Sequence, residues 1–319
     1  MLSVYEVSNG RCLIPIDPAE LPPTWPTDEV VRWVRMASPA PQDLRAILGE
    51  VELPDEFVEV GQAEDVRTLV NVRGKLLFVS LPILLDDGRR LSCLRLICSA
   101  STLITIQQEA NPGLDMLATE LQEDEDRMQG GLATIILEIF EAALENVSPA
   151  YFALRREVDR LASALETMPS DVSMDAILEL RRRASRLSML LEDHLYCHAE
   201  LQRRRLQTPW LASMREQLHE HVAGVERGST LLARIEDRLS SLRQHYLDRL
   251  QEVTSHRLNV LAVLSAIYLP PTLVAGIYGM NFEDIPITHI PHGYFIVMSV
   301  MAAVVLGQFW YFYRRGWFK

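Results

Sequence analysis

The sequence contains few cysteines and none of the motifs by which several common enzyme classes are recognised. Only four cysteines occur in 319 residues, and no two of them form a CxxC pair. Such isolated cysteines are typical of buried, reduced thiols. The motifs GxxxxGK[ST], GxGxxG, HExxH and GxSxG are missing from the sequence, so nothing indicates nucleotide-dependent, zinc-protease or serine-hydrolase chemistry. We therefore expect neither an enzyme nor a small organic substrate.

Excess basic charge is also lacking. The chain has 31 Lys and Arg against 43 Asp and Glu, a formal net charge of −12. This balance argues against a nucleic-acid partner, which needs a basic face, and suits a cation partner better. The first residues, MLSVYEVSNG, contain neither a basic start nor an apolar core, so no signal peptide is expected there.

Two long uncharged segments lie toward the C-terminal end. Residues 258–282 and 285–313 contain no Asp, Glu, Lys or Arg, and His289 and His292 set the start of the second apolar stretch near residue 293. Each segment exceeds the roughly 20 residues that cross a bilayer as a helix. A buried core helix is the alternative, but it rarely needs this length. We predict transmembrane helices at 258–280 and 293–313, an external loop at 281–292 and a tail at 314–319.

Flanking charges predict the orientation of these helices. Basic residues precede the first span and follow the second, whereas the connector carries Glu283 and Asp284 and no Lys or Arg. Because positive charge prefers the cytoplasmic side, both termini should lie in the cytoplasm. The membrane is then expected to be the inner, or plasma, membrane.

The part of the chain before the spans divides into three predicted regions. Residues 1–130 indicate a mixed α/β domain, with a half-buried strand at 30–36, a short helix at 41–49 and a meander formed by RTLVNV, KLLFVSLPIL, RLSCLRLIC and STLITIQQ. Residues 131–207 predict paired helices, the first interrupted or bent near Pro149 and the second beginning near residue 174. Residues 208–257 predict a stalk helix.

Apolar residues recur every seven positions along the stalk. The series is Leu211, Leu218, Val225, Leu232, Leu239, Tyr246, Val253, Val260 and Ile267, and a companion series offset by three is Met214, His221, Gly228, Ile235, Leu242, Arg249, His256 and Val263. This spacing is typical of a helix packed along its length, as in a coiled coil. No proline lies between Pro209 and Pro270, so the stalk should continue directly into the first span.

A second face of the first span carries small or weakly polar side chains, with two leucines among them. We call it the seam: Ser255, Leu258, Ala262, Ser265, Leu269, Thr272, Gly276 and Gly279. Two interpretations stay open, ordinary close packing of transmembrane helices and the lining of a central path in a symmetric oligomer. In the second, Leu258 and Leu269 would form constrictions that gate by dewetting. The pair Pro270–Pro271 frees backbone carbonyls that a water-filled lumen could receive.

The stretch LPPTLVAGIYGMNFEDIP, placed between two C-terminal spans, resembles the CorA family of divalent-cation channels through its triplet Gly279-Met280-Asn281. The resemblance covers the whole plan of the chain. It implies an α+β membrane protein that assembles as a homopentameric funnel, with five stalk helices continuing into the spans that line the pore.

The same resemblance implies roles for individual residues. Gly279, Met280 and Asn281 would form the selectivity filter, and the pore lining and gate would comprise Thr272, Leu269, Ser265, Ala262, Leu261, Leu258 and Ser255. Glu283 and Asp284 would attract cations outside the mouth. A ring of neutral oxygens suits Mg²⁺, which gives up its waters reluctantly. The implied function is Mg²⁺ uptake, with Co²⁺ and Ni²⁺ as further cargo.

Two other functions stay open at this point. The similar ZntB-type zinc transporters use the same Gly-Met-Asn architecture, and His289 and His292 in the external loop suit Zn²⁺ better than Mg²⁺. A proton-coupled Zn²⁺ transporter is therefore the first alternative. The second is a membrane-anchored scaffold whose stalk only oligomerises.

Candidate metal sites are also present before the spans. His194 and His198 fall on one face of a helix and could form a metal clip, although a solvated or interhelical surface is the simpler interpretation. The family carries regulatory cation sites between neighbouring cytoplasmic domains, and Glu220 with Asp86 and Asp87 could form one in this chain. For the two aspartates a solvated turn is the simpler interpretation.

Overall fold

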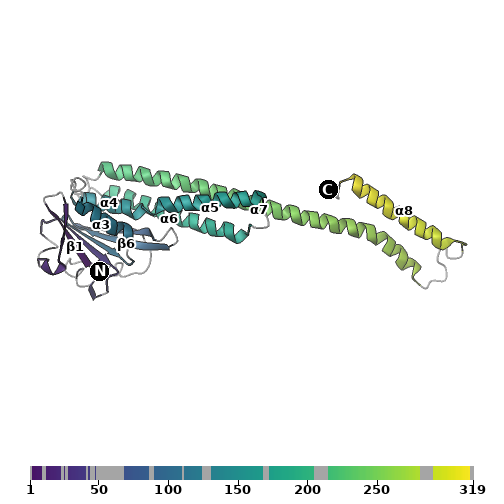
Figure 1. The fold of residues 1–319 in the computed structure, drawn as a ribbon, viewed down its shortest axis with the longest axis horizontal. Helices are drawn as coiled ribbons and strands as arrows, with labels where there is room; N and C mark the ends of the chain where they lie inside the picture. The colour runs from purple at the N-terminus through teal and green to yellow at the C-terminus, as the bar shows by residue number, and fades with distance from the viewer. Residues whose placement is uncertain are drawn as a thin grey trace. The chain divides into compact units, whose positions relative to one another are not determined.

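The computed structural model describes residues 2–8, 12–22, 25, 28–40, 42–43, 47, 68–85, 90–109, 111–123, 131–167, 172–204, 215–280 and 290–316 (Figure 1). These residues belong to two compact units, Met1–Leu242 and Arg243–Lys319.

The first unit contains a mixed seven-stranded sheet. Its strands are β1 (Leu2–Ser8), β2 (Cys12–Ile16), β3 (Arg32–Ala37), β4 (Leu69–Arg73), β5 (Leu76–Leu85), β6 (Arg90–Cys98) and β7 (Thr102–Gln107). They follow the order β2-β1-β3-β7-β6-β5-β4. Only the β3–β7 pair is parallel, and the other neighbours are antiparallel. The meander predicted for β4 to β7 is confirmed.

The strand at 30–36 differs from its prediction in burial. The structure places β3 between β1 and β7, and Arg32–Met36 are all buried rather than half-buried. One face of the sheet packs on helices through residues such as Trp33, and the opposite face carries Val34 against Trp25. The alternation of apolar and polar residues therefore occurs here on a strand whose two faces are both buried. The predicted helix at 41–49 lies mostly outside the described residues.

Four helices follow or cover the sheet: α3 (Pro112–Glu123), α4 (Leu132–Leu144), α5 (Val147–Thr167) and α6 (Met174–Arg204). Gly131 precedes α4 with φ 62°, a conformation that glycine adopts without steric penalty. The predicted interruption near Pro149 is confirmed, but the break itself lies at Glu145 and Asn146. Pro149 falls in the first turn of α5, where its missing N–H removes no helical hydrogen bond.

Helix α7 (Arg215–Tyr278) begins in the first unit and continues in the second. In its first part the heptad residues are buried in the chain itself. Those buried are Leu218, Val225, Leu232, Ile235, Leu239 and Leu242, most of them packed with α5 and α6. Leu211 and Met214 lie outside the described residues. The heptad prediction is therefore confirmed for the part of α7 that precedes residue 243.

The second unit consists of the remainder of α7 and of α8 (Gly293–Arg314). Helix α7 passes through Pro270 and Pro271 without ending. Both helices are long and apolar enough to cross a membrane, and their apolar segments are almost unburied within the chain. The finer division of the chain into domains stays a prediction.

Candidate functional site

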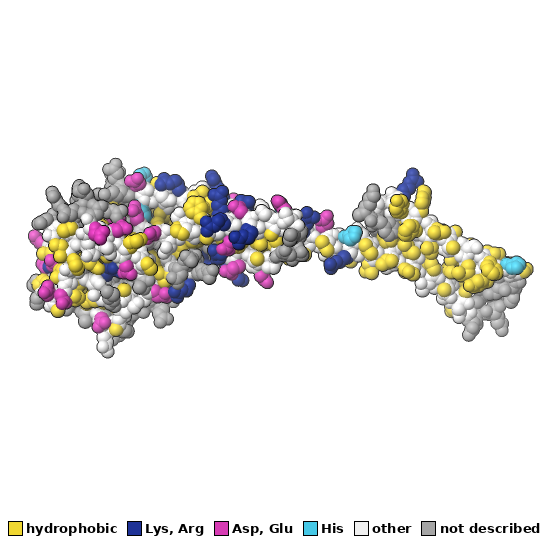
Figure 2. Space-filling model, viewed as in Figure 1, with side chains coloured by type: hydrophobic (Ala, Val, Ile, Leu, Met, Phe, Trp, Pro, Cys, Tyr) yellow, Lys and Arg dark blue, Asp and Glu magenta, His cyan; other side chains and the backbone are white. Residues whose placement is uncertain are grey.

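The seam of α7 is uncovered within the chain. All eight seam residues are exposed, and Leu258 and Leu269 expose 59% and 66% of their surface. Leu261, which borders the seam, exposes 61%. Figure 2 shows that hydrophobic side chains predominate on the surface of the second unit, whereas the surface of the first unit carries many charged side chains. Apolar surface of this extent requires a cover that one chain does not supply.

A shallow groove runs along the seam near the C-terminal end of α7. It is lined by Ser265, Tyr268, Leu269, Thr272, Leu273, Gly276, Ile277 and Met280. A separate crevice separates α7 from α8 and is lined on the α7 side by Val274, Ala275 and Tyr278. At about 100° per residue, Val274 and Tyr278 lie about 180° and about 140° around α7 from the centre of the seam, and Ala275 lies about 80° from it. Helix α8 therefore leaves the seam open.

The seam contains hydroxyl oxygen atoms among its apolar side chains. The Thr272 hydroxyl donates to the Tyr268 carbonyl over 2.7 Å, which leaves the lone pairs of the hydroxyl oxygen directed away from that bond. Pro270 and Pro271 have no N–H, so the carbonyls of Ala266 and Ile267 lack their usual helical donors. The Thr272 hydroxyl thus lies on the seam one turn from Leu269, whereas the two freed carbonyls belong to residues that lie about 100° and about 160° around α7 from the centre of the seam.

Backbone hydrogen bonds continue past the end of α7 to the start of the Gly-Met-Asn triplet. The Gly279 N–H donates to the Ala275 carbonyl over 2.9 Å, and the Met280 N–H to the Ile277 carbonyl over 3.3 Å. A Cβ on Gly279 would lie 3.2 Å from the Ala275 carbonyl oxygen, so glycine permits this close approach. Asn281, which completes the triplet, lies outside the described residues, so its role stays a prediction.

Other residues of the predicted external loop also lie largely outside the described part. Glu283, Asp284 and His289 belong to that group. His292 is described: it precedes α8 in a left-handed conformation, with φ 70°. Its ring lies 6.5 Å from that of Phe295, and its side chain forms no capping hydrogen bond.

The predicted regulatory metal site is only partly described. Glu220 is exposed and lines a cavity of about 520 Å³ between α4, α5 and α7, together with Glu138 and Glu141. Asp86 and Asp87 lie outside the described residues. Among the residues that the structure describes, no three His, Cys, Asp or Glu side chains converge on a point that could hold a metal ion.

The two histidines of α6 do not form the metal clip considered from the sequence. His194 and His198 have no exposed surface. His194 Nε2 donates to the Pro82 carbonyl over 2.9 Å, and His198 Nδ1 donates to the His194 carbonyl over 2.5 Å. The interhelical interpretation is confirmed and the solvated one is wrong, because the Arg- and Glu-rich pattern of α6 hid a buried polar stripe.

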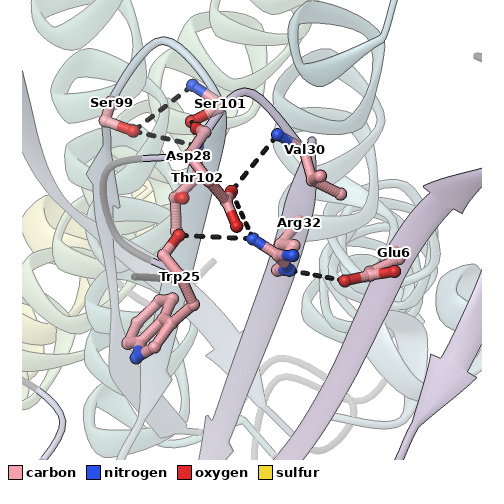
Figure 3. A network of polar contacts seen from close by, with 8 residues as sticks. All are labelled: Glu6, Trp25, Asp28, Val30, Arg32, Ser99, Ser101 and Thr102. Atoms are coloured by element: carbon pink, nitrogen blue, oxygen red, sulfur yellow. Dashed lines mark hydrogen bonds and ion pairs between the residues drawn. The ribbon is translucent and has the colours of Figure 1, made fainter. Parts of the chain in front are cut away.

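A partly buried ion-pair network at the edge of β3 was not predicted from the sequence (Figure 3). Arg32 contacts the Glu6 carboxylate at 2.6 Å and the Asp28 carboxylate at 2.5 Å, and donates to the Trp25 carbonyl. Burial alone would lower the pKa of Arg32, but these two carboxylates raise it above its usual value. The network ties β1 and the segment before β3 to β3 itself. We assign it a structural role.

A mixed α/β unit, a helix that continues into a bilayer-length apolar segment and a second apolar helix together define an α+β membrane protein. The model of the CorA-like Mg²⁺ transporter protein family matches residues 28–314. The chain therefore belongs to this family, whose members are membrane transporters rather than enzymes.

Individual relatives agree with this assignment. The magnesium transport protein CorA of Pasteurella multocida is 25% identical over 187 residues, which cover 57% of this chain and 58% of that protein. The matched region thus spans little more than half the length of that relative.

Similarity to solved structures supports the fold. The CorA magnesium transporter of Methanocaldococcus jannaschii has a TM-score of 0.78 at 17% identity, over 99% of this chain and 98% of that one. The ZntB cytoplasmic domain of Vibrio parahaemolyticus has a TM-score of 0.63 at 11% identity, over 78% of this chain and 98% of that one.

Proposed function

We propose that the chain forms a homopentameric channel that conducts Mg²⁺ across the inner membrane into the cytoplasm, with Co²⁺ and Ni²⁺ as further cargo. The observation that carries the proposal is the open seam of α7, which ends at Gly279 and Met280 and which α8 does not cover. In a ring of copies, each seam would face a common axis while α8 faces lipid. Both termini would then lie in the cytoplasm.

The chemistry of the seam supports passage of a hydrated divalent ion. Mg²⁺ keeps several waters when it binds to proteins, so neutral hydroxyl, carbonyl and amide oxygens can recognise it through its hydration shell. The hydroxyls of Ser265 and Thr272 supply such oxygens one turn before and one turn after Leu269 on the seam. Neutral groups also release a divalent ion more readily than a ring of carboxylates would.

The exposed leucines support a gate on the same path. Rings of Leu258, Leu261 and Leu269 would form apolar constrictions that exclude water when narrow and pass ions when widened. Cytoplasmic cations bound near Glu220 would screen repulsion between acidic subunits and stabilise a closed state. Their loss would shift the population toward an open state.

The direct test is cation flux into proteoliposomes that contain the purified full-length chain. Mg²⁺, Co²⁺, Ni²⁺ and Zn²⁺ are offered separately, with and without a membrane potential and a pH gradient. The channel proposal expects Mg²⁺ entry that follows the membrane potential and ignores the pH gradient. Entry of no cation above the protein-free control would overturn it.

Proton-coupled Zn²⁺ transport is the second candidate. It is favoured by the fold shared with the ZntB cytoplasmic domain and by histidine at positions 289 and 292. In the same vesicles it expects Zn²⁺ entry that scales with an imposed pH gradient. Replacement of both loop histidines with Gln should then reduce Zn²⁺ entry and leave Mg²⁺ entry unchanged.

A further inference from the structure

Three histidine rings meet inside the first unit where α6 lies against α7. His194 and His198 belong to α6 and are fully buried, whereas His221 belongs to α7. The rings of His198 and His221 are stacked, with centroids 4.7 Å apart and planes 17° apart. The His194 ring lies 6.4 Å from that of His198. The three rings thus form a continuous histidine column from the sheet to α7.

Hydrogen bonds assign the protons within this column. Because carbonyl oxygens only accept, His194 carries its proton on Nε2, facing Pro82, and His198 carries its proton on Nδ1. The remaining nitrogens, Nδ1 of His194 and Nε2 of His198, are buried lone pairs without a partner in the described structure. Nε2 of His221 is buried and unpartnered as well. A proton added to His194 or His198 would therefore create a buried cation with no acceptor.

The charged and titratable groups around the column do not compensate such a cation. They are Cys93 on β6, Asp193, Cys197 and Glu200 on α6, Glu138 and Glu141 on α4, and Glu220 and Arg227 on α7. Glu200 already pairs with Arg203 at 2.6 Å. In the described part of the chain, no carboxylate forms an ion pair with any of the three rings.

Burial accordingly disfavours the charged form of each ring. It lowers the pKa of His198 below its ordinary value of 6.5, and it lowers the pKa of His194 to about 3. His221 also lines the cavity of about 520 Å³ that holds Glu138, Glu141 and Glu220. Protons can therefore reach the column from this cavity.

We propose that His198, at the centre of the histidine column, is the proton-sensitive element of a latch that holds the first part of α7 against α4 and α6 at neutral pH and releases it on acidification. The column suits a proton better than a metal ion, because among the described residues no three metal-binding side chains converge on a common point. A proton requires only one free lone pair.

The direction of the effect follows from the difference in proton affinity between the two states. In the released state the His198 ring, no longer covered by α7, would titrate near 6.5, whereas in the closed state it binds a proton only at lower pH. The closed state is therefore fully favoured above about pH 6.5. Below that pH the ratio of closed to released chains falls by up to about tenfold per pH unit for the one proton that His198 gains on release.

Hydrogen exchange on the full-length protein tests the latch without any transport measurement. Amide protection of residues 215–242, corrected for the intrinsic effect of pH on exchange, is compared at pH 7.5 and pH 5.5. We expect at least a tenfold loss of protection in the unmodified protein. The double variant His198→Phe, His221→Phe keeps aromatic rings that cannot bind protons, so its protection should change little.

The matched control is His219→Phe, because His219 is exposed on the same helix two residues from the column. This variant should lose protection as the unmodified protein does. Equal protection at both pH values in the unmodified protein would overturn the proposal, and so would an undiminished loss in the double variant. Should the double variant fail to assemble, His198→Gln alone is compared by the same criterion, with a reduced loss expected.

A consequence for transport rests on the proposed function. Release of α7 should raise Mg²⁺ flux several-fold when the cytoplasmic face of proteoliposomes is acidified, and the double variant should show no such rise. A chain that conducts no cation would refute the proposed function, while the exchange measurement would still decide the latch. Flux that ignores cytoplasmic pH despite pH-dependent exchange would refute the link between them.

Discussion

The two parts of α7 have the same spacing of apolar residues and opposite surroundings. Before residue 243, Leu218, Leu232 and Leu239 are at most 5% exposed because α4, α5, α6 and the sheet cover them. After it, Leu258 and Leu269 expose more than half of their surface. A period of three and four residues thus identifies a face of a helix but not the molecule that covers it. The first face is covered by its own chain, and the second requires lipid or other copies.

The largest expected effect concerns the end of the second part. Asn281→Ala should reduce Mg²⁺ flux to the level of protein-free vesicles, because it removes the amide oxygens proposed to recognise the hydrated ion. Flux into proteoliposomes is the measurement. Asn259→Ala is the matched control, because Asn259 is exposed on α7 and is not one of the seam residues. Unchanged flux in Asn281→Ala would refute the proposed role of Asn281 in the filter.

The contrast in burial predicts a contrast in stability. Leu232→Ala removes a fully buried side chain and should lower the free energy of unfolding by about 2–5 kcal/mol. Leu250→Ala removes a side chain that is 48% exposed and should change it by less than about 1 kcal/mol. Denaturant unfolding of the full-length protein in detergent measures both. Equal losses would mean that Leu250 is covered as completely as Leu232 in the assembly.

A polar substitution on the seam should act on gating. Leu269→Ser should raise Mg²⁺ flux several-fold, because a hydroxyl ring wets a constriction that leucine keeps dry. Leu264→Ser is the matched control: Leu264 is also exposed on α7, at 48%, but lies off the seam. Comparable flux in the two variants would remove the argument that the seam faces the ion path.

The smallest expected effects come from one glycine in each part of α7. A Cβ on Gly228 would lie 3.1 Å from Leu191 Cδ1, whereas a Cβ on Gly276 would meet no other atom within 4 Å. Alanine gains about 1 kcal/mol of helix propensity, which the Leu191 contact should offset in Gly228→Ala. Gly276→Ala should leave stability unchanged or raised but lower flux modestly. Unfolding and flux measured on both variants test this difference.

Local patterns predicted the helices and most of the sheet because each pattern repeats over many residues. The uncharged segments marked both apolar helices, and the heptads marked the part of α7 buried within the chain. The coverage of β3 on both faces could not be predicted, since alternation looks the same whether one face or both are covered. The seam was predicted as a face of α7, but its cover depends on other molecules.

The histidine column shows a different limit. His194 and His198 lie among many charged residues, so their positions suggested a surface, and His221 is far from them in sequence. Their contact depends on how α6 meets α7, which no local pattern encodes. The Arg32–Glu6 ion pair was missed for the same reason, because Glu6 meets Arg32 only after β1 and β3 pair.

The end of α8 has its own consequence. The guanidinium of Arg314 lies 5.3 Å from the centre of the Trp310 ring, and that of Arg315 lies 5.2 Å from the centre of the Tyr311 ring. Tryptophan and tyrosine prefer the level of lipid headgroups, and the arginines resist entry into hydrocarbon. Helix α8 would then be anchored at a fixed depth, so that vertical sliding of one subunit past its neighbours would be opposed at every copy of this aromatic and basic cluster.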